Sequence, residues 1–237
     1  MVVELEDYFS PFYLVYDHLV PVPESRLVVS CELSNMMKGK LGPLEFPLAL
    51  GELVAHFDGR PFDRDLIRFE YWEEWPPLPP GLSAAALTKV VVEGCAVCGG
   101  PPLRWSYYCK RCQNFINGQK RDNIYHVRAM KRSWDPEVGG FLCSYTGARL
   151  DDGCRWSPWY LNFDHATPGD RRTIDVAAAW VNRMKTALSA DEFRKVVREY
   201  DRHLRDGERF DPHVVRFRHW KRAFMPRRRG RRTIDRD

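Results

Sequence analysis

The chain has 237 residues, of which 44% are hydrophobic and 29% are charged. This composition excludes fibrous and intrinsically disordered classes. The formal net charge of +5 is unevenly distributed: residues 1–94 carry 7 Lys and Arg against 15 Asp and Glu, and residues 95–237 carry 30 against 17. We therefore expect the second part to bind a polyanion.

The N-terminal sequence is acidic and lacks the basic start and apolar run of a signal peptide. No stretch approaches the roughly 20 apolar residues that a membrane-spanning helix needs. We expect a protein that is not secreted and has no membrane partner, located in the cytoplasm or with the nucleoid.

Residues 1–80 form an acidic accessory region whose role the sequence does not indicate. Two β-rich runs, Phe12–Tyr16 and Arg26–Ser30, precede an amphipathic stretch at Leu48–Phe57. The proline-rich segment Trp75–Leu82 is unsuited to a helix or a central strand and predicts a stiff linker. It lies just before the charge reversal, which indicates a domain boundary there.

Residues 81–134 contain the end of this linker and then two Cys-x-x-Cys pairs in a basic segment. The pairs are formed by Cys95, Cys98, Cys109 and Cys112. Thiolate is the ligand type of structural zinc sites, and four protein ligands leave no open position for catalysis. Nearby glycines (Gly94, Gly99 and Gly100) suit the tight turns of a zinc knuckle. The alternatives are unligated thiols, which two such pairs disfavour, and an iron site.

The other three cysteines carry weaker signals. Cys143 and Cys154, with His126, form half of another metal site in one interpretation, but free thiols are the better one. Cys31 has no expected function. An odd cysteine count without a signal peptide argues against a disulfide framework.

The region 135–215 contains short strands followed by helices. The pattern predicts a basic helix over Lys120–Ser133, then strands at Phe141–Tyr145 and Trp159–Phe163, then an alanine-rich helix at Ile174–Leu188. Ser189 and Glu192 form a capping box that starts a last helix, with Gly207 as its stop. The expected buried stripe of this helix is Phe193, Val196, Val197, Tyr200 and Leu204.

Three motifs occur in order within this region. They are Phe141-x-Cys143-x-Tyr145-Thr146-Gly147-x-x-Leu150, then Ser157-Pro158-x-Tyr160-Leu161-x-Phe163-Asp164-His165-x-x-Pro168-Gly169, then Val181-Asn182-x-Met184-Lys185. Together they resemble HNH endonucleases, the ββα-metal or His-Me finger family, in which flanking cysteine pairs are also common. The resemblance covers roughly residues 95–193 and implies an α+β fold: a ββα-metal core, a zinc knuckle, a helical basic C-terminus and a separate N-terminal accessory part.

The resemblance also implies how each residue acts. His165 is the general base that activates water, a task suited to a side chain that titrates near neutral pH. Asp164 and Asn182 hold one catalytic Mg²⁺ or Mn²⁺ at the scissile phosphate, because such ions prefer oxygen ligands. Lys185, one helical turn from Asn182, contacts phosphate. Many family members have His where this chain has Asn182, and Asp175 replaces an Asn that often steadies the loop.

The expected partner is nucleic acid, with double-stranded DNA preferred. Arg171 and Arg172 lie in the loop before the helix that carries Asn182, and both are expected to contact phosphates. The basic tail, residues 216–237, includes Arg227, Arg228 and Arg229, and its arginine run suits sequence-independent phosphate contacts. Two alternatives remain open: a non-catalytic zinc-knuckle protein that binds nucleic acid, with Asp164–His165 as a structural pair, and a protein–protein adaptor that uses residues 1–80.

Overall fold

The computed structural model describes residues 10–22, 25–72, 94–95, 97–101, 103, 108–117, 123–152 and 156–220. Its elements, in chain order, are β1 (Leu14–His18), β2 (Leu27–Cys31), α1 (Glu32–Lys38), α2 (Glu45–Phe57), a 3₁₀ turn η1 (Arg64–Leu66), α3 (Lys110–Asn117), α4 (Asn123–Ser133), β3 (Trp134–Asp135), β4 (Gly140–Phe141), β5 (Leu161–His165), β6 (Ile174–Ala178), α5 (Ala179–Lys185) and α6 (Ala190–Asp206). The strands form three two-stranded antiparallel sheets, β1–β2, β3–β4 and β5–β6. The expected α+β class is confirmed.

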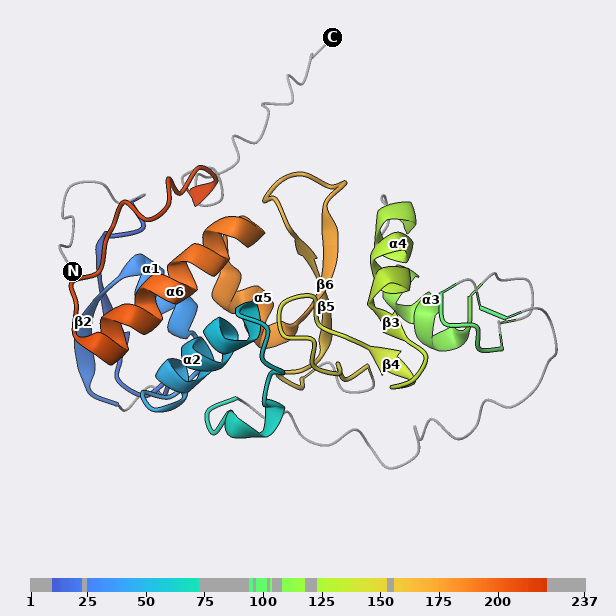
Figure 1. Cartoon of the computed structure of the whole chain (residues 1–237), viewed down its shortest axis with the longest axis horizontal. Coiled ribbons are helices and arrows are strands. Elements are labelled where there is room, and N and C mark those ends of the chain that lie inside the picture. The colour runs from blue at the N-terminus through green and yellow to red at the C-terminus, as the bar shows by residue number, and fades with distance from the viewer. Residues whose placement is uncertain are drawn as a thin grey trace, which may run out of the picture.

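The β5–β6 hairpin lies between two groups of helices (Figure 1). On one side α1 packs against α5 and α2 against α6, and on the other α4 packs against β6. Residues 10–72 therefore do not pack apart from the C-terminal helices. The buried hydroxyl of Tyr200 on α6 makes a 2.5 Å hydrogen bond with the Ser34 hydroxyl on α1, and both regions contribute to one hydrophobic core.

The expected helix at Ile174–Leu188 is wrong for its first five residues, which form β6. Ile174 and Val176 are β-branched and buried, and the strand pairs residue by residue with β5. These tertiary contacts outweigh the helix preference of the neighbouring alanines. The expected strand at Phe141–Tyr145 is also shorter than predicted, because only Gly140–Phe141 belongs to β4.

The last helix matches its prediction closely. Both hydrogen bonds of the Ser189–Glu192 capping box are present, and Gly207 ends α6 with a positive φ of 69°. Four members of the expected apolar stripe are buried, but Leu204 is 46% exposed because it lies in the last turn, beyond the core. Among the described residues no helix is long and apolar enough to cross a membrane.

Candidate functional site

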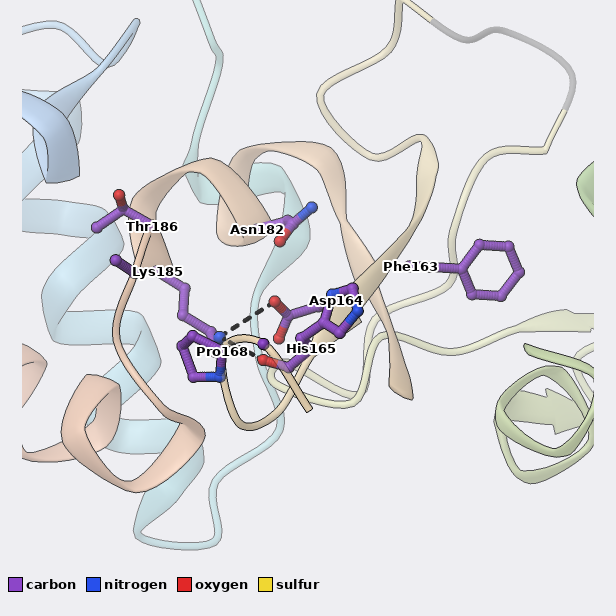
Figure 2. Close-up of a pocket in the computed structure, with 9 residues that line it drawn as sticks. Phe163, Asp164, His165, Pro168, Asn182, Lys185 and Thr186 are labelled. Carbon is purple, nitrogen blue, oxygen red and sulfur yellow. Dashed lines mark hydrogen bonds and ion pairs between the residues drawn. The ribbon is translucent and has the colours of Figure 1, made fainter. Parts of the chain in front are cut away.

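The hairpin and the helix after it bring the predicted catalytic residues together. Asp164 and His165 are the last residues of β5, and Asn182 lies on α5, which begins directly where β6 ends. Successive side chains of a strand point to opposite faces, so Asp164 faces α5 while Phe163 points the other way (Figure 2). Asp164, His165 and Asn182 line one pocket of about 420 Å³.

The carboxylate of Asp164 is almost completely buried, and each of its two oxygens accepts a hydrogen bond. Tyr145 donates its hydroxyl to Oδ2 at 2.5 Å, and Lys185 donates its ammonium to Oδ1 at 3.1 Å. Lys185 also donates to the backbone carbonyl of His165 at 2.9 Å. Asp164 is 4% exposed and Lys185 1%. The three side chains therefore form a buried network, of which Asp164 and Lys185 line the pocket (Figure 2).

Burial shifts the pKa values of Lys185 and Tyr145. It lowers the pKa of Lys185, while the adjacent Asp164 raises it and so opposes the effect. Burial together with the Asp164 charge raises the pKa of Tyr145, which stays protonated as a hydrogen-bond donor. The Lys185–Asp164 pair compensates the charge of this carboxylate at ion-pair distance.

His165 is exposed at the end of the strand. Partial desolvation lowers the pKa of its imidazole; Asp164 opposes this shift, whereas the nearby His126, Lys185 and Arg171 add to it. A lowered pKa leaves the imidazole uncharged at neutral pH, the form in which it can accept a proton.

The remaining predicted residues have different surroundings. Arg171 and Arg172 are exposed in the loop between β5 and β6, whereas Arg227, Arg228 and Arg229 lie outside the described residues. Lys185, expected to contact phosphate, lines the pocket, and its ammonium is paired with Asp164. Asp175 forms an ion pair with Arg132 of α4 at 3.1 Å, which ties α4 to β6.

Sequence reasoning missed the role of Tyr145. It lies 19 residues before Asp164, and no spacing rule links the two positions. Cys143 and His126, grouped in one interpretation as half of a metal site, have other surroundings. The amide of Ala178 donates to the Cys143 sulfur at 3.4 Å, and the His126 ring packs edge-on against Phe163. Cys154 lies outside the described residues.

The four paired cysteines converge as expected. The Sγ atoms of Cys95, Cys98, Cys109 and Cys112 all lie within 4.8 Å of one another. The turn that holds the first pair depends on glycine: a Cβ on Gly94 would lie 2.1 Å from the Gly99 carbonyl oxygen, and Gly99 has a positive φ of 73°. The expected need for glycine in this turn is confirmed at Gly94 and Gly99.

The donor set of this cluster suits a soft cation. Sulfurs about 2.3 Å from a tetrahedral zinc are about 3.8 Å apart, and the Cys98 and Cys109 sulfurs are 3.6 Å apart. Backbone amides donate to two sulfurs, Val97 to Cys95 and Cys112 to Cys109. Burial and the neighbouring sulfurs raise the pKa of Cys98 to about 11. Burial acts in the same direction at Cys95, but hydrogen bonds from the surrounding backbone and sulfurs outweigh it and lower the pKa of Cys95 to about 7. A bound cation would compensate the repulsion between thiolates, and the cluster can hold a metal ion.

The surroundings of the cluster are basic. The helices α3 and α4, within the bounds given above, contain no Asp or Glu. Arg128 and Lys131 are exposed on α4, one turn apart.

Comparisons of the chain with protein-family models, with curated proteins and with solved structures find no match.

Proposed function

We propose that the protein is a metal-dependent endonuclease of the HNH type, which hydrolyses phosphodiester bonds in DNA. One observation carries the proposal: three polar side chains from two elements line one pocket. Asp164 and His165 lie at the end of β5, and Asn182 lies on α5, the helix that follows β6. A carboxylate, an imidazole and an amide around one accessible space are a set of groups suited to metal-assisted hydrolysis.

The oxygen donors fit a hard divalent ion. Asp164 offers a carboxylate and Asn182 an amide oxygen, and Mg²⁺ commonly takes only one or two protein ligands beside water and phosphate. The position next to Asp164 already accepts a cation, the Lys185 ammonium. When bound, Mg²⁺ or Mn²⁺ supplies Lewis acidity at the scissile phosphate.

The protein groups divide the remaining tasks. The uncharged imidazole of His165 accepts a proton from the attacking water, and the Lys185 bond to the His165 carbonyl holds the backbone of the base in place. Arg171 and Arg172 lie exposed on the loop beside the pocket and offer bidentate contacts to a phosphate backbone.

A structural zinc at the four cysteines and a nucleic-acid partner are part of the same proposal. The exposed basic residues of α4 and the arginines of the tail, Arg227, Arg228 and Arg229, support a partner with a phosphate backbone. A location in the cytoplasm or on the nucleoid follows from that partner.

A cleavage assay tests the catalytic part. Purified protein is incubated with supercoiled plasmid and Mg²⁺ or Mn²⁺, and conversion to the nicked form is measured. We expect His165→Ala to lose about 10²–10⁴-fold in rate, with fold and DNA binding retained. Asn182→Ala should also lose activity, but part of it should return at higher Mn²⁺ because one metal ligand is missing. Arg183→Ala, next to Asn182 but stacked on Trp72 outside the pocket, is the matched control.

The buried network favours one second candidate, a non-catalytic nucleic-acid-binding protein. In that function Asp164, Tyr145 and Lys185 only hold the hairpin against α5. Salt-sensitive DNA binding with no cleavage in either metal would favour it. Cleavage that persists in His165→Ala would place the active site elsewhere.

A further inference from the structure

Lys185 occupies the position next to the carboxylate where the catalytic ion is expected. Its ammonium lies 3.1 Å from Asp164 Oδ1, and the two side chains are 1% and 5% exposed. The same lysine lines the pocket together with His165 and Asn182 (Figure 2). It is therefore both the buried partner of Asp164 and a wall of the space where a phosphate would lie.

We propose that Lys185 is a built-in counter-cation of the metal site, which a divalent ion displaces from Asp164. This inference rests on the proposed function for the metal that it names. It assigns Lys185 a positioning role: in metal-free protein the lysine pairs with the Asp164 carboxylate and holds it in place, and once displaced it provides a positive charge in the pocket.

The physical argument starts from the cost of a buried charge. An ionised carboxylate removed from water is strongly unfavourable unless a cation or several hydrogen-bond donors compensate it. Tyr145 supplies one neutral donor to Oδ2, so the ammonium of Lys185 is the charge that balances Asp164. A divalent ion at Oδ1 and the ammonium repel each other, and the four-carbon stem of lysine lets the ammonium move away.

A displaced ammonium needs a new partner. The pocket that Lys185 lines is open to solvent, and a phosphate entering it brings negative charge. Metal and phosphate should therefore bind with positive cooperativity, because the phosphate compensates the ammonium that the metal releases. Metal alone should bind weakly, since it has to displace an ion pair that is already formed.

Thermal denaturation in MnCl₂ without nucleic acid tests the exchange. Lys185→Met leaves Asp164 charged and unpaired, so its midpoint should fall by roughly 10 °C without metal. Saturating Mn²⁺ should restore roughly half of that loss, because the ion replaces the missing cation. Wild type should gain less from Mn²⁺. The double variant Asp164→Asn with Lys185→Met lacks both charges and should gain nothing, although it retains the four cysteines.

A second measurement uses only wild-type protein and therefore tests the proposal even if Lys185→Met fails to fold. Wild-type protein is treated with an amine-reactive reagent with and without Mg²⁺, and modification of each lysine is measured by mass spectrometry. Lys185 should be protected without metal and several-fold more reactive with it. Lys195, exposed on α6 away from the pocket, is the internal reference and should not change.

The outcomes separate this inference from the nuclease proposal, because neither measurement requires cleavage. Restoration of Lys185→Met by Mn²⁺, or Mg²⁺-dependent labelling of Lys185, supports the exchange even in a protein that cuts nothing. A Lys185→Met protein that folds but is not restored by Mn²⁺, or labelling of Lys185 that stays unchanged throughout a Mg²⁺ titration, overturns the exchange and leaves the nuclease proposal standing.

Discussion

Replacing Cys112 with Ser tests the four-cysteine cluster most directly. Cys112 is completely buried, and its sulfur lies within 4.8 Å of the other three. Two thiolates at that distance repel each other by about 3–4 kcal/mol at an effective dielectric constant of ~20. A bound cation attracts each thiolate and outweighs the repulsion between them, so the metal and the four sulfurs stabilise the segment only together.

The Cys112→Ser substitution should greatly reduce the stability of the segment 94–117 and have little effect on the stability of the rest of the protein. Structural zinc contributes an apparent ~10–16 kcal/mol to the folding of small zinc domains, whereas the segment 94–117 has few other buried side chains, among them Val97 and Phe115. We expect Cys112→Ser to contain almost no zinc and to lose amide-exchange protection across 94–117. The core around α2, α5 and α6 should keep its protection, because α2 packs against α6, and α5 against α1 and β5.

Cys143→Ser is the matched control. Cys143 is also buried, at 2% exposure, but it lies outside the cluster and accepts from the Ala178 amide, a bond that a hydroxyl can keep. It should lose about 1–2 kcal/mol of stability and retain its zinc. The measurements are elemental analysis and hydrogen exchange by mass spectrometry. A well-folded wild type without zinc or iron, or a Cys112→Ser protein with one zinc, would refute the reasoning.

Two further predictions concern binding and stability. Deleting residues 226–237 should weaken nucleic-acid binding on all sequences alike and flatten its salt dependence, because an arginine run contacts phosphates rather than bases; an unchanged salt slope in a titration would contradict this. Tyr145→Phe removes the hydrogen bond to Asp164 Oδ2 and should lower the free energy of unfolding by about 2 kcal/mol. Urea denaturation measures the change, and Tyr16→Phe, on a ring that is 69% exposed, is the control.

The sequence located most of the candidate site because the signals were local. Asp164 and His165 are adjacent, Asn182 follows on the next helix, and the cysteine pairs have a spacing that brings two turns to one ion. The capping box of α6 was equally readable, since its two hydrogen bonds join residues three apart. What these residues do chemically remains a prediction, supported by their shared pocket.

Two expectations failed where local and tertiary preferences disagree. The run Ile174–Ala178 precedes helical residues and carries alanines, so its pattern favours helix, but pairing with β5 makes it a strand. The run Phe141–Tyr145 favours a strand, but only its first residue pairs in a ladder, with Trp134 of β3, and Tyr145 hydrogen-bonds Asp164 instead.

By itself the sequence determined the residue types, their order and the turns that bring near neighbours together. These depend on backbone preferences and spacings of a few residues, which the chain carries locally. Only the tertiary structure decided that Tyr145 and Lys185, 19 and 21 residues from Asp164, share its carboxylate. Burial creates that requirement: a carboxylate that water would satisfy anywhere on the surface must find its donors inside the protein, and only packing determines which ones are within reach.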